Sequence, residues 1–157
     1  MRNGQDRNAN NSPALYGWRQ YGDHGIMSGN DTRYPTFYTF KLLKYFARAG
    51  DEIVRTTRDH KLLSVYAARR ADGTLALLAI NKSPDATLKA GISIAGFLPE
   101  SEAITYSYGI PQDEAARTGT GSQDIAQASF TGAATEFPCK FPPYSATVIV
   151  LSPLRGN

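Results

Sequence analysis

The feature that most constrains the fold is a change in the hydrophobic pattern after Gly50. Before this glycine the apolar residues recur at helical spacing, whereas after it they follow the period of two that is typical of strands. Turn residues such as Ser83-Pro84-Asp85 and Pro142-Pro143 separate the apolar runs. We therefore predict strands over residues 53–57, 62–69, 75–81, 87–94, 103–108, 129–131, 135–141 and 146–151.

This series of short strands predicts a mainly β fold, an antiparallel β-sandwich, over residues 51–153. Ala71-Asp72-Gly73 joins two of the β-rich runs, and Asp-Gly in that place is a strong hairpin signal. The segment 109–127 is long and polar and interrupts the series. We interpret it as a loop, because loops of this length are usually functional or disordered.

Two helices are expected before the sandwich. Residues 1–12 contain four asparagines and predict a flexible lead-in. Ser12 and Pro13 are typical of a helix start, and Gly22 is a natural end for that first helix. Residues 25–28 predict a short buried strand.

A second helix is predicted from Pro35 to the stop at Gly50. It is aromatic on several sides, so it must pack against another surface. The domain division that follows is a lead-in over 1–12, a helical segment over 13–50 and a sandwich over 51–153.

Charge and hydropathy limit the function classes that the sequence supports. The chain has 17 basic and 14 acidic residues, and a net charge of +3 is too small and too mixed to indicate nucleic-acid binding. No apolar stretch is long enough to predict a membrane span, and no signal peptide follows Met1. Basic residues gather in one region, which predicts either a positive stripe or a solvated face. They are Arg55, Arg58, His60, Lys61, Arg69 and Arg70.

Three segments carry a resemblance to a known class of proteins. They are YPTFYTFKLLKYFARAGDEIV (34–54), LLSVYAARRADGTLALLAINKSPD (62–85) and FPPYSATVIVLSP (141–153). Together they resemble the C-terminal portion of retaining clan-A glycoside hydrolases, in which a β-sandwich follows a (β/α)8 barrel. The chain is similar to family-44 endoglucanase/xylanase-type and arabinofuranosidase-type enzymes. In this resemblance, the helices over 13–50 correspond to the end of the barrel.

The resemblance implies a function. The two catalytic glutamates of such enzymes would lie upstream of Met1, so the implied role is a non-catalytic accessory module of a plant-polysaccharide hydrolase. That role is structural, with contact to β-glucan or xylan as a further expectation. The implied partners are polysaccharide and either the missing barrel domain or a second copy bound through the aromatic helix. The implied location is extracellular.

The alternative is a small complete glycoside hydrolase that acts on β-glucan, xylan or arabinoxylan. Such an enzyme needs two carboxyl groups across the sugar bond, and the candidates are Asp113, Glu114 and Asp23. A third reading is a truncation product whose partner is missing. Two histidines without clustered ligands predict no metal site, and no phosphate-binding glycine loop is present, so we expect no cofactor.

Sugar binding would need aromatic faces beside polar groups. Tyr106 and Tyr108 alternate along one predicted strand and would present both rings on one face. Tyr144, in the turn after Pro142-Pro143, would add a rim. Core packing is the competing interpretation of these three tyrosines, and their exposure to solvent decides between the two.

Overall fold

The computed structural model describes residues 26–27, 31 and 33–154. The predicted lead-in, the helix expected after Ser12 and the candidate Asp23 all lie outside these residues. Of the predicted strand over 25–28, residues 26 and 27 are described, and Met27 forms an isolated antiparallel bridge with Arg33. The elements that follow are α2 (Pro35–Leu43), β1 (Glu52–Val54), β2 (Leu63–Arg69), β3 (Leu75–Asn81), β4 (Leu88–Ser93), β5 (Pro99–Tyr108), α3 (Ile110–Thr118), β6 (Ala126–Thr131), β7 (Glu136–Phe141) and β8 (Ser145–Pro153).

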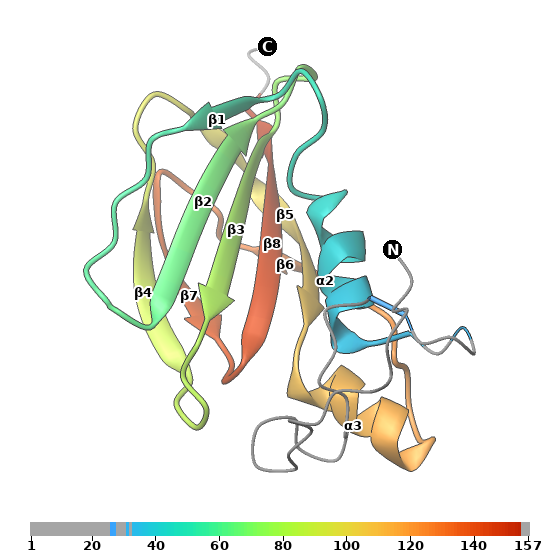
Figure 1. Ribbon diagram of the computed structural model, residues 1–157. Helices are drawn as coiled ribbons and strands as arrows, with labels where there is room; N and C mark the ends of the chain where they lie inside the picture. The colour runs from blue at the N-terminus through green and yellow to red at the C-terminus, as the bar shows by residue number, and fades with distance from the viewer. Residues whose placement is uncertain (1–25, 28–30, 32, 155–157) are drawn as a thin grey trace.

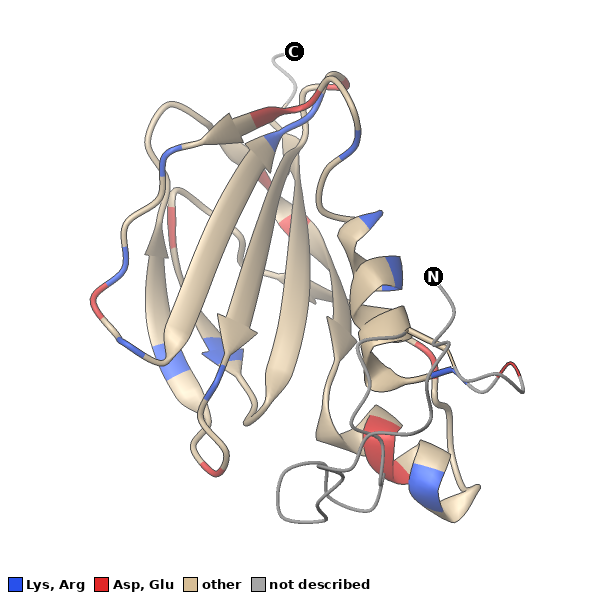
Figure 2. Ribbon diagram, viewed as in Figure 1, with Lys and Arg blue, Asp and Glu red and all other residues tan. Residues whose placement is uncertain are grey.

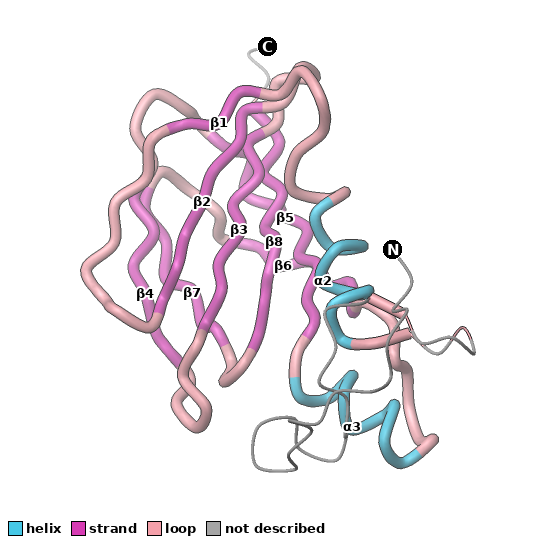
Figure 3. Tube along the Cα trace, in the orientation of Figure 1, coloured by secondary structure: helices cyan, strands magenta, loops and turns pink. Residues whose placement is uncertain are grey.

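The strands form two antiparallel sheets (Figures 1 and 3). The large sheet has six strands in the order β1-β2-β3-β8-β5-β6, and the small sheet consists of β4 and β7. The small sheet covers one face of the large sheet, and α2 lies against the opposite face beside β5 and β8 (Figure 1). The predicted mainly β antiparallel sandwich is confirmed.

Two apolar layers hold these elements together. The inner layer lies between the sheets and includes Leu77, Ile149 and Phe141. The outer layer lies between the large sheet and α2 and includes Leu42 and Val148. In the middle of the large sheet, β3 is therefore apolar at successive positions rather than at alternate ones, because both of its faces are covered.

The helix α2 ends at Leu43, earlier than the predicted stop at Gly50. Beyond it, Tyr45 and Phe46 continue as turns in which each amide donates to the carbonyl three residues earlier. The guanidinium of Arg70 donates to the carbonyl oxygens of Tyr45 and Phe46. Since these carbonyls obtain a tertiary donor, the chain leaves the helix without losing hydrogen bonds.

The interpretation of 109–127 as a loop is wrong over its first half, where α3 is found. Pro111 lies in the first turn of α3, and Gly119 ends the helix at φ 72°. The Gln112 side chain accepts a hydrogen bond of 2.9 Å from the amide of Gly109, which satisfies one donor at the helix start. The segment was interpreted as a loop because it is polar, although Pro111 and Gly119 are start and stop signals for a helix.

Asn81, at the end of β3, holds two turns at one end of the sandwich. Its side chain is 1% exposed. Its amide group donates to the carbonyl oxygens of Ala86, Phe141 and Pro142 at 2.8 to 2.9 Å, and its oxygen accepts from the amide of Ser83 at 2.8 Å. One buried side chain therefore joins the turn after β3 to the turn before β8.

Removing this side chain should be costly. In Asn81→Ala the buried carbonyls lose their donor, so we expect the free energy of unfolding to fall by about 2 to 3 kcal/mol. Urea unfolding followed by circular dichroism measures the change. Lys82→Ala, at the exposed neighbouring position, is the control and should shift the value by less than about 0.5 kcal/mol. Equal stability of the two variants would contradict the role given to Asn81.

Candidate functional site

Two pairs of stacked tyrosines hold α2 and the turn that follows it on the outer face of the large sheet. The rings of Tyr38 and Tyr108 lie 5.1 Å apart and nearly parallel. The rings of Tyr45 and Tyr106 lie 3.7 Å apart, with an interplanar angle of 10°. Stacked rings favour association beyond the apolar area that they bury. These contacts fix the helix along β5.

The expected sugar platform of Tyr106 and Tyr108 is thereby corrected. The two rings do lie on one face of β5, as the alternation predicted, but α2 covers that face. Tyr108 is 5% exposed, and Tyr106 is half-buried against Tyr45. Core packing is the interpretation that the structure favours for both residues.

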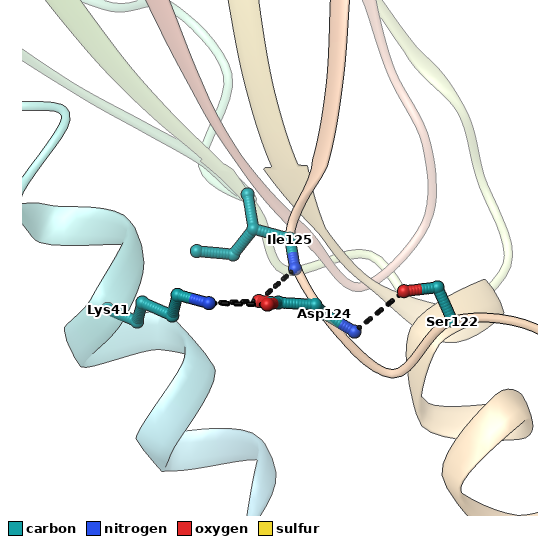
Figure 4. Close-up of polar contacts among 4 residues, drawn as sticks. All are labelled: Lys41, Ser122, Asp124 and Ile125. Atoms are coloured by element: carbon teal, nitrogen blue, oxygen red, sulfur yellow. Dashed lines mark hydrogen bonds and ion pairs between the residues drawn. The ribbon is translucent and has the colours of Figure 1, made fainter.

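A polar contact joins α2 to the segment after α3 (Figure 4). The ammonium group of Lys41 forms an ion pair with the Asp124 carboxylate and donates to its Oδ1 at 2.6 Å. The same Oδ1 accepts from the amide of Ile125, and the amide of Asp124 donates to the Ser122 hydroxyl. The hydrogen bond from Lys41 is the main reason why the pKa of Asp124 is lowered.

The side of α2 that faces away from the sheet exposes two large apolar side chains beside Thr36 and Thr39. Phe40 is 63% exposed and Leu43 is 41% exposed. Further large apolar side chains of the large sheet are also exposed. They lie on the same face as α2, since their cross-strand neighbours belong to the outer layer. We call this set the outer apolar surface, and it consists of Phe40, Leu43, Ile53, Tyr66 and Ile104. Covering such side chains with another surface would remove apolar area from water, which is favourable.

Of the candidate carboxylates, Asp113 and Glu114 lie within the described residues. Asp113 and Glu114 are consecutive residues of α3, so their side chains diverge by about 100° around the helix. Glu114 accepts from the Arg117 guanidinium at 2.6 and 2.9 Å, and this contact lowers its pKa. A general acid needs a raised pKa instead. Among the described residues, no group of three or more His, Cys, Asp or Glu side chains is placed to hold a metal ion.

Tyr144 is the candidate that does remain available to a ligand, with 58% of its surface exposed. Its amide donates to the Ser83 carbonyl at 2.9 Å, and its backbone has a φ of 40°, which is unusual for a residue with a side chain. The adjacent Pro143 and Ser145 line a cavity of about 500 Å³ beside the start of α3. The turn held by Asn81 therefore exposes a tyrosine whose two chain neighbours line the cavity.

Asn81 and Lys41 are site residues that the sequence analysis missed. Asn81 is the last residue of the predicted apolar strand over 75–81, and nothing local indicates that its side chain binds two turns. The partner of Lys41 lies 83 positions further along the chain. Such a partner cannot be read from local spacing.

Comparisons with known proteins agree with this fold. No protein-family model matches the chain, and no curated protein matches it in sequence. Among solved structures, a bifunctional glucanase-xylanase from a metagenome library matches with a TM-score of 0.60 and 24% identity over 76% of this chain. A family-30 endoxylanase from Clostridium papyrosolvens matches with a TM-score of 0.62 and 17% identity over 82% of this chain. A family-30 subfamily-8 xylanase from Clostridium acetobutylicum matches with a TM-score of 0.63 and 15% identity over 87% of this chain.

The resemblance to glycoside hydrolases predicted from the sequence is confirmed at the level of the fold. This chain spans 22%, 30% and 32% of the lengths of those three structures, so it shares the fold of a part of each. Two of the three belong to family 30, which the sequence motifs did not predict. No described helix is long and apolar enough to cross a membrane.

The Lys41–Asp124 contact predicts how stability depends on pH. The folded-state pKa of Asp124 lies below its ordinary value of 3.8. Its stabilisation is therefore complete above that value and is lost as the pH falls through the lower folded-state pKa. Because the Asp124 side chain is 49% exposed, we expect the effect to be below about 1 kcal/mol.

Asp124→Asn should accordingly be less stable than the parent chain at about pH 7, and the difference should vanish at about pH 2. Urea unfolding at a series of pH values measures it. Asp59→Asn, at an exposed loop position, is the matched control and should show no such difference. A deficit of Asp124→Asn that stays constant down to the acid limit would contradict the assignment.

Proposed function

We propose that this chain is a non-catalytic accessory β-sandwich module of a plant-polysaccharide glycoside hydrolase. Its primary role is structural, since its outer apolar surface packs against the catalytic barrel of such an enzyme. The observation that carries the proposal is the exposure of Phe40 and Leu43 on a helix whose other side is fixed to the sheet. Exposing apolar side chains of a helix to water costs free energy. A partner that covers them removes this cost.

The comparisons support the polysaccharide context. The named neighbours are a glucanase-xylanase and two xylanases, and the chain matches a minor part of each. Contact with β-glucan or xylan through Tyr144 is a secondary element of the proposal. An extracellular location is proposed with it, since polymers of this kind are degraded outside the cell.

The alternative, a small complete hydrolase, gives the competing outcome of the test. It would require two of Asp113, Glu114 and Asp23 to act on the same glycosidic bond. The contact of Glu114 with Arg117 favours the accessory module instead, because a carboxylate with a lowered pKa is a poor proton donor near neutral pH.

The two functions differ in sugar release. We expect the purified chain to release no reducing sugar from β-glucan, xylan or arabinoxylan above the level of a buffer blank. Release that is abolished in Asp113→Asn or Glu114→Gln would overturn the proposal and establish a small enzyme. Arg117→Gln is the matched control, because it removes the partner of Glu114 but keeps both carboxylates.

A further inference from the structure

A groove lies at the free edge of the small sheet, and some of the basic residues that cluster in the sequence between Arg55 and Arg70 line it. The groove has a volume of about 350 Å³ and lies between residues 54–59 and β4. Arg55, Arg58 and Arg69 line it. Arg70 instead turns toward the end of α2 and donates to backbone carbonyls there. Most of the cluster is exposed, as a solvated face would be, and three of its arginines line a groove that is separate from the outer apolar surface.

The groove combines an apolar floor with a cationic rim. Val65, Ile92 and Phe97 are half-buried in the floor and pack against the inner layer. Arg58 donates to the His60 carbonyl at 3.2 Å, and Arg69 donates to the Gly96 carbonyl at 3.0 Å. Each of these contacts uses one of the five N–H donors of a guanidinium, so the rim keeps donors for a ligand.

Two acidic residues limit the positive charge of this region. Asp59 lines the groove, and Glu52 is the cross-strand neighbour of Arg69. Figure 2 shows this alternation along the loop between β1 and β2, where blue segments flank one red segment. A site with so small an excess of positive over negative charge suits a polymer with widely spaced carboxylates. It suits a nucleic acid less well, because a nucleic acid carries a phosphate on every nucleotide.

We propose that this groove binds a uronic-acid-bearing polysaccharide. The arginines would pair with the sugar carboxylate, for which the guanidinium fork is well matched, and the apolar floor would contact the C–H face of a neighbouring ring. The choice of a polysaccharide as the ligand class rests on the proposed function. The charge and shape of the groove are independent of it.

The test compares glucuronoxylan with the same polymer after its carboxyl groups have been reduced. Affinity gel electrophoresis and titration calorimetry are carried out on the full chain at low salt. We expect retardation by glucuronoxylan, none by the reduced polymer, and weaker binding as salt is raised. Arg55→Gln combined with Arg58→Gln should weaken binding by at least about tenfold, as expected when charge-assisted hydrogen bonds are lost.

A second double variant, Arg48→Gln with Lys82→Gln, removes the same charge from exposed positions outside the groove and should bind like the parent chain. Equal binding of both polymers, equal loss in both double variants, or no binding at all would overturn the proposal. Tighter binding of single-stranded RNA would overturn it in favour of a nucleic-acid site. None of these results bears on sugar release, so the groove and the accessory role fail separately.

Discussion

The structure depends on the large sheet being apolar on both of its faces. In β3 and β8 successive residues are buried, so the sheet needs a covering layer on each side. The small sheet supplies the inner cover and α2 supplies the outer one. The stacking of Tyr38 on Tyr108 and of Tyr45 on Tyr106 determines where α2 lies, and this placement leaves Phe40 and Leu43 facing away.

A helix narrower than the sheet that it covers leaves apolar area beside it. Ile53, Tyr66 and Ile104 belong to that area, and they extend the exposed side of α2 into the outer apolar surface. The basic groove lies at the free edge of the small sheet, so a ligand and a packed domain could be held at the same time.

The sequence predicted the strands well, because alternation of apolar residues and turn chemistry are local signals. The strand over 75–81 matches β3, and the hairpin at Asp72-Gly73 joins β2 to β3. The predictions that failed concern side chains whose contacts are with residues distant in the sequence. The face shared by Tyr106 and Tyr108 was predicted, but its burial follows from α2, which lies more than sixty positions earlier in the chain. The functions of Asn81 and Lys41 likewise depend on residues brought together only by folding.

If the outer apolar surface packs against a further domain, as proposed, it should drive association when it is left uncovered, and sedimentation equilibrium over a range of concentrations measures this association. In the absence of the proposed barrel partner, the isolated chain should associate reversibly, with a second copy covering this surface. Phe40→Glu combined with Leu43→Glu should sediment as a monomer at every concentration. Leu98→Glu, at an exposed apolar position outside this surface, should associate like the parent chain. A parent chain that remains monomeric at the highest concentration, or a double variant that associates equally, would contradict the account.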